Sequence, residues 1–135
     1  MILPALTEAT SPLFRPIKYS LFPPLGLATL ASYLGPDDDV PICDEHVERL
    51  SLDDDPDLVV IQVYITSARR SYDIADHYRR RGVRVALGGL HVTSLPGAAA
   101  AHPDHGSLGP GAGPWPALPT YLPSGGENRP GLAYP

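Results

Sequence analysis

The sequence has a single cysteine, Cys43, among its 135 residues. One cysteine excludes an internal disulfide, a cysteine-rich zinc site and an iron–sulfur cluster held by this chain alone. No apolar run approaches the roughly 18 residues that a membrane-spanning helix needs, and no secretory signal pattern is visible near residue 1. We therefore expect a cytoplasmic protein that does not bind membranes.

Positive charge is also scarce, because ten lysines and arginines stand against fifteen aspartates and glutamates, giving a net charge of −5. This balance argues against nucleic acid as a partner. Hydrophobic residues make up 43% of the chain, which is typical of a globular protein with a packed core. Several arginines fall between residues 69 and 81, where we expect the solvated face of a helix, with a partner-binding surface as the alternative.

Proline and glycine divide the chain into two parts. Of the 40 residues from 96 to 135, 17 are proline or glycine, and they follow no collagen-like repeat. Such density is typical of loops and of segments without regular structure. We predict one α/β domain over residues 1–115 and a mobile proline- and glycine-rich tail over residues 116–135.

The first part alternates short apolar runs with helical patterns. The predicted strands are residues 1–6, 40–43, 58–63 and 83–87, with a stunted fifth strand at 107–108. The predicted helices are residues 27–34, 67–81 and 96–102, and Ser67 and Gly82 stand where an N-cap and a helix-ending glycine are expected. Strands and helices that alternate at this spacing indicate βαβ units, hence a parallel sheet with helices on both faces.

Ligands of such sheets bind beyond the carboxyl ends of the strands. Four segments of this sequence follow predicted strands: Asp44-Glu45-His46, Tyr64-Ile65-Thr66-Ser67, Gly88-Gly89-Leu90-His91 and the turn that contains Gly109 and Gly111. Paired glycines have no Cβ, so they allow either a cofactor ring or a neighbouring loop to approach the backbone closely. We therefore expect the working surface at this edge of the sheet.

A longer pattern points to a family. The stretch from Phe22 to Leu34 (FPPLGLATLASYL) resembles the opening of the cobalamin-binding domain of cobalamin-dependent radical S-adenosylmethionine enzymes. Later features follow in the family's order at residues 44–46, 57–60, 72–82 and 88–96, so the resemblance covers residues 1–115. It implies a flavodoxin-like or Rossmann-like doubly wound sheet of four to five parallel strands, order 2-1-3-4-5, in three α/β/α layers, with cobalamin over the carboxyl edge.

The same resemblance assigns the residues that would contact cobalamin. They are Tyr64, Ile65, Thr66 and Ser67, then Gly88, Gly89, Leu90 and His91, and finally Gly109 and Gly111. The chain departs from the family in two respects: it lacks the cysteines of the radical cluster, and Pro110 and Ala112 occupy places where acids are usual. It therefore cannot start radical chemistry alone, and we assign no metal ligand to it.

Three functions remain open from the sequence. The first is a free-standing module that carries a corrinoid for a partner enzyme. The second is a cofactor-independent enzyme on the same scaffold, which isomerises or cyclises a small biosynthetic substrate by acid–base chemistry; its candidate groups are Asp44, Glu45, His46, Tyr64 and His91. The third is a non-enzymatic remnant or regulatory partner. A stunted fifth strand would leave a sheet edge that self-association could cover.

Overall fold

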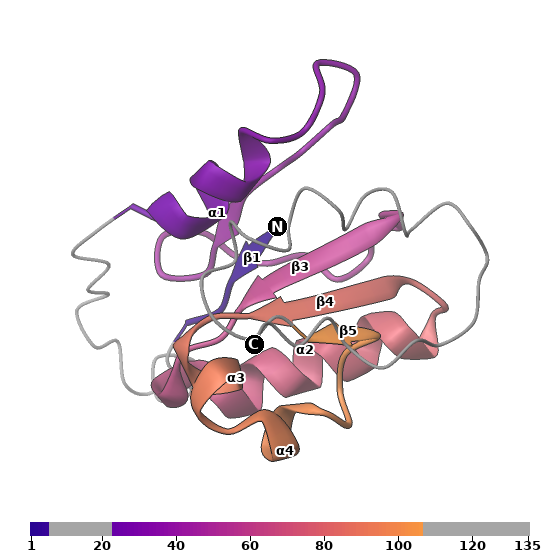
Figure 1. Cartoon of the computed structure of the whole chain (residues 1–135). Helices are drawn as coiled ribbons and strands as arrows, with labels where there is room; N and C mark the ends of the chain where they lie inside the picture. Colours follow the sequence, from indigo (N-terminus) through magenta and orange to yellow (C-terminus); the bar gives the residue numbers. More distant parts are fainter. Residues whose placement is uncertain (6–22, 107–135) are drawn as a thin grey trace.

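Five parallel strands form the centre of the molecule (Figure 1). A computed structural model describes residues 1–5 and 23–106. The strands are β1 (Ile2–Leu3), β2 (Cys43–Asp44), β3 (Leu58–Gln62), β4 (Arg84–Gly88) and β5 (His105–Gly106). They lie in the order β2-β1-β3-β4-β5, and every neighbouring pair is parallel. The predicted fold class and strand order are therefore confirmed.

The β3–β4 pair is the longest ladder and carries most of the sheet's core. Its register runs from Leu58 opposite Arg84 to Gln62 opposite Gly88. Apolar side chains alternate between the two faces, as the pleat requires. Ile61 is fully buried in the larger core cluster, whereas Val60 belongs to the smaller cluster on the other face. A strand covered on both faces explains the unbroken β-branched run in the sequence.

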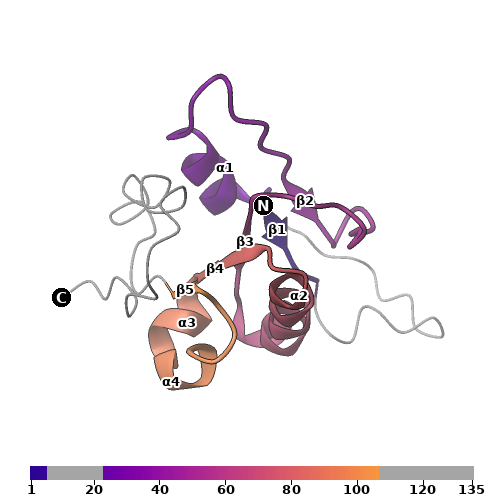
Figure 2. The same ribbon diagram turned by 90° about the vertical axis from the view of Figure 1, so that its right-hand side faces the viewer.

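Helices cover the two faces of the sheet unequally (Figure 2). The short helix α1 (Leu25–Ala31) lies on one face, where Leu27 is buried against Leu3 and Val60. The helices α2 (Ala68–Arg80), α3 (Leu90–Ser94) and α4 (Pro96–Ala99) lie on the other. The result is the expected three-layer α/β/α arrangement, with the larger core on the α2 side.

Helix α2 agrees with its prediction at the carboxyl end and differs at the amino end. Gly82 has φ +81°, the left-handed conformation expected of a glycine that ends a helix. Ser67 precedes the helix, but its side chain caps no backbone N–H. A short 3₁₀ helix, η2 (Ile65–Ser67), turns the Ser67 hydroxyl back toward the Tyr64 carbonyl, 3.5 Å away. Ser67 therefore occupies the predicted N-cap position, but its side chain does not cap the helix.

Helix α3 differs from the prediction, which places no helix between residues 88 and 95. Gly89 has φ +110°, which lets the chain leave β4 and enter a helix at once. Val92 then anchors the helix in the core. The predicted helix at 96–102 is the shorter α4, and strand β2 begins at Cys43 rather than at residue 40. The predicted strand at 107–108, Gly109, Gly111 and the boundary at 115 lie outside the described residues.

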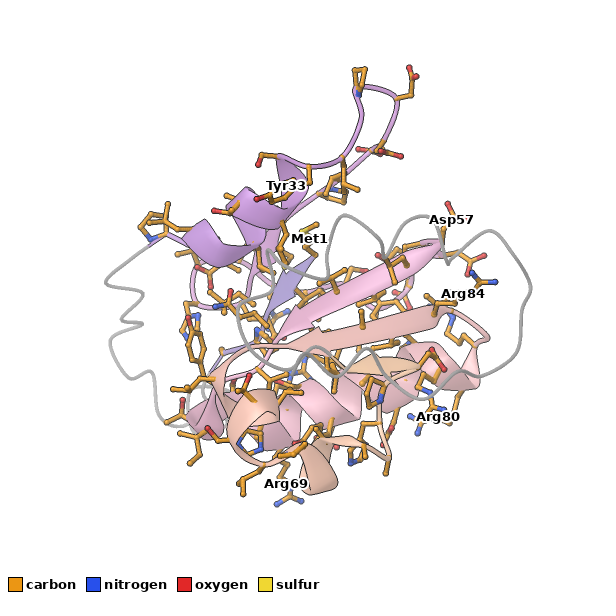
Figure 3. The ribbon with its side chains drawn as sticks, viewed as in Figure 1. Met1, Tyr33, Asp57, Arg69, Arg80 and Arg84 are labelled. Atoms are coloured by element: carbon orange, nitrogen blue, oxygen red, sulfur yellow. The ribbon has the colours of Figure 1, made fainter. Side chains whose placement is uncertain are left out.

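The arginines of α2 are partly engaged in tertiary contacts. Arg70 pairs with Glu45, and Arg79 pairs with Asp104. Arg69 and Arg80 are exposed on the same helix (Figure 3), as expected of a solvated face. Within residues 1–5 and 23–106, no helix has both the length and the apolar character needed to cross a bilayer.

Candidate ligand-binding site

The turns that follow β3 and β4 lie side by side at the carboxyl edge of the sheet. The Val63 N–H donates to the Gly88 carbonyl at 2.8 Å, and the His91 N–H donates to the Val63 carbonyl at 3.3 Å. These bonds bring two predicted segments together, residues 64–67 and 88–91. We call this pair of turns the rim. The prediction that separate strand ends would converge here therefore holds for both of these segments.

The side chains of the rim divide into exposed and buried groups. Tyr64, Ile65 and Leu90 are 42%, 73% and 70% exposed, although they follow neighbouring strands and are large side chains with apolar surface. Ser67 and His91 are buried instead. The exposed residues of the rim are thus mainly apolar, and they include the hydroxyl-bearing Thr66.

Gly89 explains how the two turns come so close. A Cβ at this position would lie 2.9 Å from the carbonyl oxygen and 3.1 Å from the amide nitrogen of Val63. Real Cβ atoms do not approach backbone atoms so closely. The sequence left open whether a cofactor ring or a neighbouring loop approaches this glycine. The structure places the loop after β3 against it.

His91 faces the interior rather than the rim. It is 7% exposed, and its Nδ1 has no hydrogen-bond partner within the described part of the chain. Its ring lies 6.0 Å from that of Tyr72, whose hydroxyl is also buried and unpartnered there and whose pKa is raised by burial. The ring of His102 stacks on that of Tyr72, with the ring centroids 4.2 Å apart. Nδ1 of His102 lies 3.0 Å from Oδ1 of Asp76. His91 therefore contributes to the contact between α2 and α3.

The acidic residues after β2 make two separate arrangements. The Glu45 carboxylate accepts the Ala5 N–H at 3.1 Å and an Arg70 N–H at 2.6 Å, so it ties β1, β2 and α2 together. This contact raises the pKa of Arg70. Asp44 is buried and its carboxylate lies 2.7 Å from Nδ1 of His46.

These acid–base candidates do not share one site with His91. Strand β2 is separated from β4 by β1 and β3, and neighbouring strands are about 4.8 Å apart, so the two strand ends are roughly 14 Å apart. The Asp44–His46 pair and His91 therefore cannot act together on one small substrate without a rearrangement. No group of three or more metal-ligating side chains occurs among the described residues.

Cys43, in β2, gives a direct chemical test of this region. Burial, and then the charge and hydrogen bond of Glu48, raise the pKa of the thiol to about 11 from 9.0. At pH 8 the thiolate fraction falls about a hundredfold relative to an unshifted thiol, because the thiolate is the charged form that burial disfavours. A thiolate of higher pKa is also the stronger nucleophile, which offsets part of this loss, so we expect Cys43 to react with a disulfide reagent at pH 8 about tenfold more slowly in the folded protein than in guanidinium. Equal rates would contradict this environment.

Sequence reasoning missed Gln62, the last residue of β3. Its side-chain Nε2 donates to the Tyr64 hydroxyl at 2.7 Å, whereas Oε1 is buried without a partner within the described residues. The available signal was a polar residue at the carboxyl end of an otherwise apolar strand. Such a residue lies where ligands of parallel sheets bind.

Comparison with known proteins adds one partial match. The chain is 41% identical over 81 residues to bacteriochlorophyllide d C-8(2)-methyltransferase of Chlorobaculum tepidum. The match covers 59% of this chain but 18% of the methyltransferase, so the chain corresponds to a small part of that protein. No family model matches the sequence. No solved structure matches it either.

Proposed function

We propose that the chain binds a corrinoid on the rim and carries it for a partner enzyme. The observation that carries this proposal is the pair of hydrogen-bonded turns that expose Tyr64, Ile65 and Leu90 at the carboxyl edge of the central strands. A flat macrocycle needs such an apolar platform, and it would cover side chains that are otherwise left in water. The family resemblance and the match to part of a methyltransferase support the same kind of module.

The residues of the rim fit a corrinoid in their chemistry. Ile65 and Leu90 would supply apolar contact. Tyr64 and Thr66 are exposed residues of the same turn, and their hydroxyls suit the amide groups at a corrin's periphery. Bound cobalamin would supply a cobalt centre that carries a methyl group. The chain's own part is to bind and orient the cobalamin. Glu45 holds the ends of β1 and β2 in place through its bonds to Ala5 and Arg70.

Retention of hydroxocobalamin tests the proposal. The protein is mixed with an excess of the compound and desalted, and the absorbance of the protein fraction is recorded. We expect a coloured fraction that contains about one corrinoid for each chain. A colourless fraction at corrinoid concentrations up to the millimolar range would contradict the proposal.

A second macrocycle belongs in the same assay. The relative's name states that it acts on bacteriochlorophyllide d, which is a flat tetrapyrrole like a corrin. Retention of a bacteriochlorophyllide with no retention of hydroxocobalamin would make the rim a binding site for a substrate, and it would contradict corrinoid carriage.

The Asp44–His46 pair favours acid–base catalysis as a second candidate. Nδ1 of His46 lies 2.7 Å from the Asp44 carboxylate. An ionised carboxylate only accepts, so a neutral His46 that donates from Nδ1 would present Nε2 as an acceptor. A metabolite that raises the melting temperature of wild type but not of His46→Ala would support this function. Full retention of hydroxocobalamin by both proteins, with no such metabolite effect, would argue against it.

A further inference from the structure

Gln62 is the single polar side chain of β3, in a strand that otherwise reads Leu-Val-Val-Ile. It stands at the carboxyl end of the strand, directly opposite Gly88 of β4 and one residue before the rim. It also projects on the α1 face, the same face as Val60, since side chains two apart in a strand share a face. An apolar residue would serve packing at this position, so the amide calls for a separate explanation.

The bond from Gln62 to Tyr64 uses the donor of the amide and an acceptor site of the phenol. The phenol oxygen of Tyr64 accepts from Gln62 Nε2, so the phenol's own proton is available to another group. Gln62 Oε1 is a buried acceptor with no partner in the part of the chain that the structure describes. Buried polar atoms in folded proteins nearly always have partners, and an orphan of this kind points to a missing water or ligand.

Gly26 of α1 makes room for the amide. A Cβ on Gly26 would lie 3.3 Å from Oε1 and 3.4 Å from Nε2 of Gln62, tighter than ordinary contact. The glycine in the Pro-Pro-Leu-Gly segment therefore allows the first turn of α1 to lie directly over the Gln62 amide. The helix, the strand end and the rim thus meet at this one polar group.

We propose that Gln62 and Tyr64 together recognise a primary carboxamide on the ligand, an inference that rests on the proposed corrinoid binding. The carboxamide oxygen accepts the Tyr64 proton, and its NH₂ group donates to Gln62 Oε1. Tyr64 is 42% exposed, and the terminal torsion of glutamine is soft, so Oε1 can turn toward the rim. This turn breaks the bond from Nε2 to the Tyr64 hydroxyl, and the two bonds to the ligand replace it. Cobalamin carries primary carboxamides around its corrin ring. A carboxylate in the same place has no proton to donate and leaves Oε1 unpaired.

Two corrinoid probes separate these cases: dicyanocobinamide, whose ring substituents are carboxamides, and dicyanocobyrinic acid, whose substituents are carboxylates. Affinity for each is measured by ultrafiltration and absorbance in 0.5 M salt, which screens the ligand's charge. We expect wild type to prefer cobinamide. Gln62→Met, which nearly keeps the side-chain volume, should weaken cobinamide binding about 5- to 10-fold and leave cobyrinic acid binding unchanged.

The tyrosine variants provide the matched control. Tyr64→Phe removes the donor, so both probes should bind about 5- to 10-fold more weakly. Tyr33→Phe should change neither affinity, because Tyr33 is exposed two residues beyond the far end of α1 (Figure 3). Melting temperatures establish that each variant is folded, and Gln62→Leu replaces Gln62→Met if the latter does not fold.

The outcomes distinguish this inference from the proposal on which it rests. If wild type binds cobinamide and the Gln62 variants keep the same preference between the two probes, carboxamide recognition is wrong and corrinoid binding stands. If wild type binds hydroxocobalamin but neither probe, carboxamide recognition is wrong and corrinoid binding stands. If wild type binds neither probe and does not retain hydroxocobalamin, corrinoid binding itself is wrong and the inference falls with it. The inference is supported if the preference for cobinamide over cobyrinic acid becomes smaller in the Gln62 variants and in no other variant.

Discussion

Replacing Gly89 by alanine is expected to lower the free energy of unfolding by about 2–4 kcal/mol. Two effects add at this position. The φ of +110° is a conformation that alanine adopts only with strain, and the new Cβ would meet the Val63 backbone at 2.9 Å. Backbone cannot move aside as a flexible side chain can, so β3 and the start of α3 would separate. Denaturant-induced unfolding followed by circular dichroism measures the change.

Gly82 provides the matched control for this substitution. It also has a positive φ, of +81°, but a Cβ there meets nothing within 4 Å. Gly82→Ala should therefore cost only about 1 kcal/mol, the conformational penalty alone. Equal losses of stability in the two variants would show that contact with Val63 is not what requires glycine at position 89.

Introducing charge on the rim should have the largest effect on ligand binding. In the variant that combines Ile65→Asp with Leu90→Asp, both changed side chains are largely exposed, so the fold should remain stable. A macrocycle seated on them loses apolar contact worth about 3 kcal/mol in total, or roughly a hundredfold in affinity. Equilibrium binding of hydroxocobalamin measures the loss.

The control for the rim variant is Val47→Asp. Val47 is 71% exposed, nearly the same as Leu90, but it follows the outermost strand β2 and not the central strands. We expect its affinity for hydroxocobalamin to stay within about twofold of wild type, since single exposed substitutions away from a contact have small effects. A similar loss in both proteins would mean that added negative charge alone, and not the rim, weakens binding.

The fold could be predicted from the sequence because its signals are local and periodic. The β-branched run of β3 identifies a strand and the spacing of Leu27 and Leu30 identifies α1, each without knowledge of the other. The helix predicted over residues 27–34 ends earlier, at Ala31, so Leu34 lies beyond it. Helix α3 escaped prediction because it depends on Gly89, whose conformation is set by contact with Val63, 26 residues away. The sequence displays the glycine but not the neighbour that makes it necessary.

The site could be predicted only to the level of segments. Strand ends identified residues 64–67 and 88–91, and the structure joins them. Whether a given side chain faces outward depends on the local backbone conformation of fewer residues than one helical turn. The 3₁₀ turn before α2 buries Ser67, and the immediate start of α3 buries His91 while leaving Leu90 exposed. Gln62 was missed because its importance lies in an unpaired atom, which a sequence does not reveal.

Hydrogen–deuterium exchange with and without hydroxocobalamin tests the central claim most directly, namely that the turns after β3 and β4 act as one ligand-binding surface. We predict slower exchange in residues 63–67 and 88–92 together when the corrinoid is present. The opposite ends of the same strands, marked by Asp57 and Arg84 (Figure 3), should not change. Protection confined to those opposite ends, or no protection in either turn at saturating corrinoid, would contradict the account.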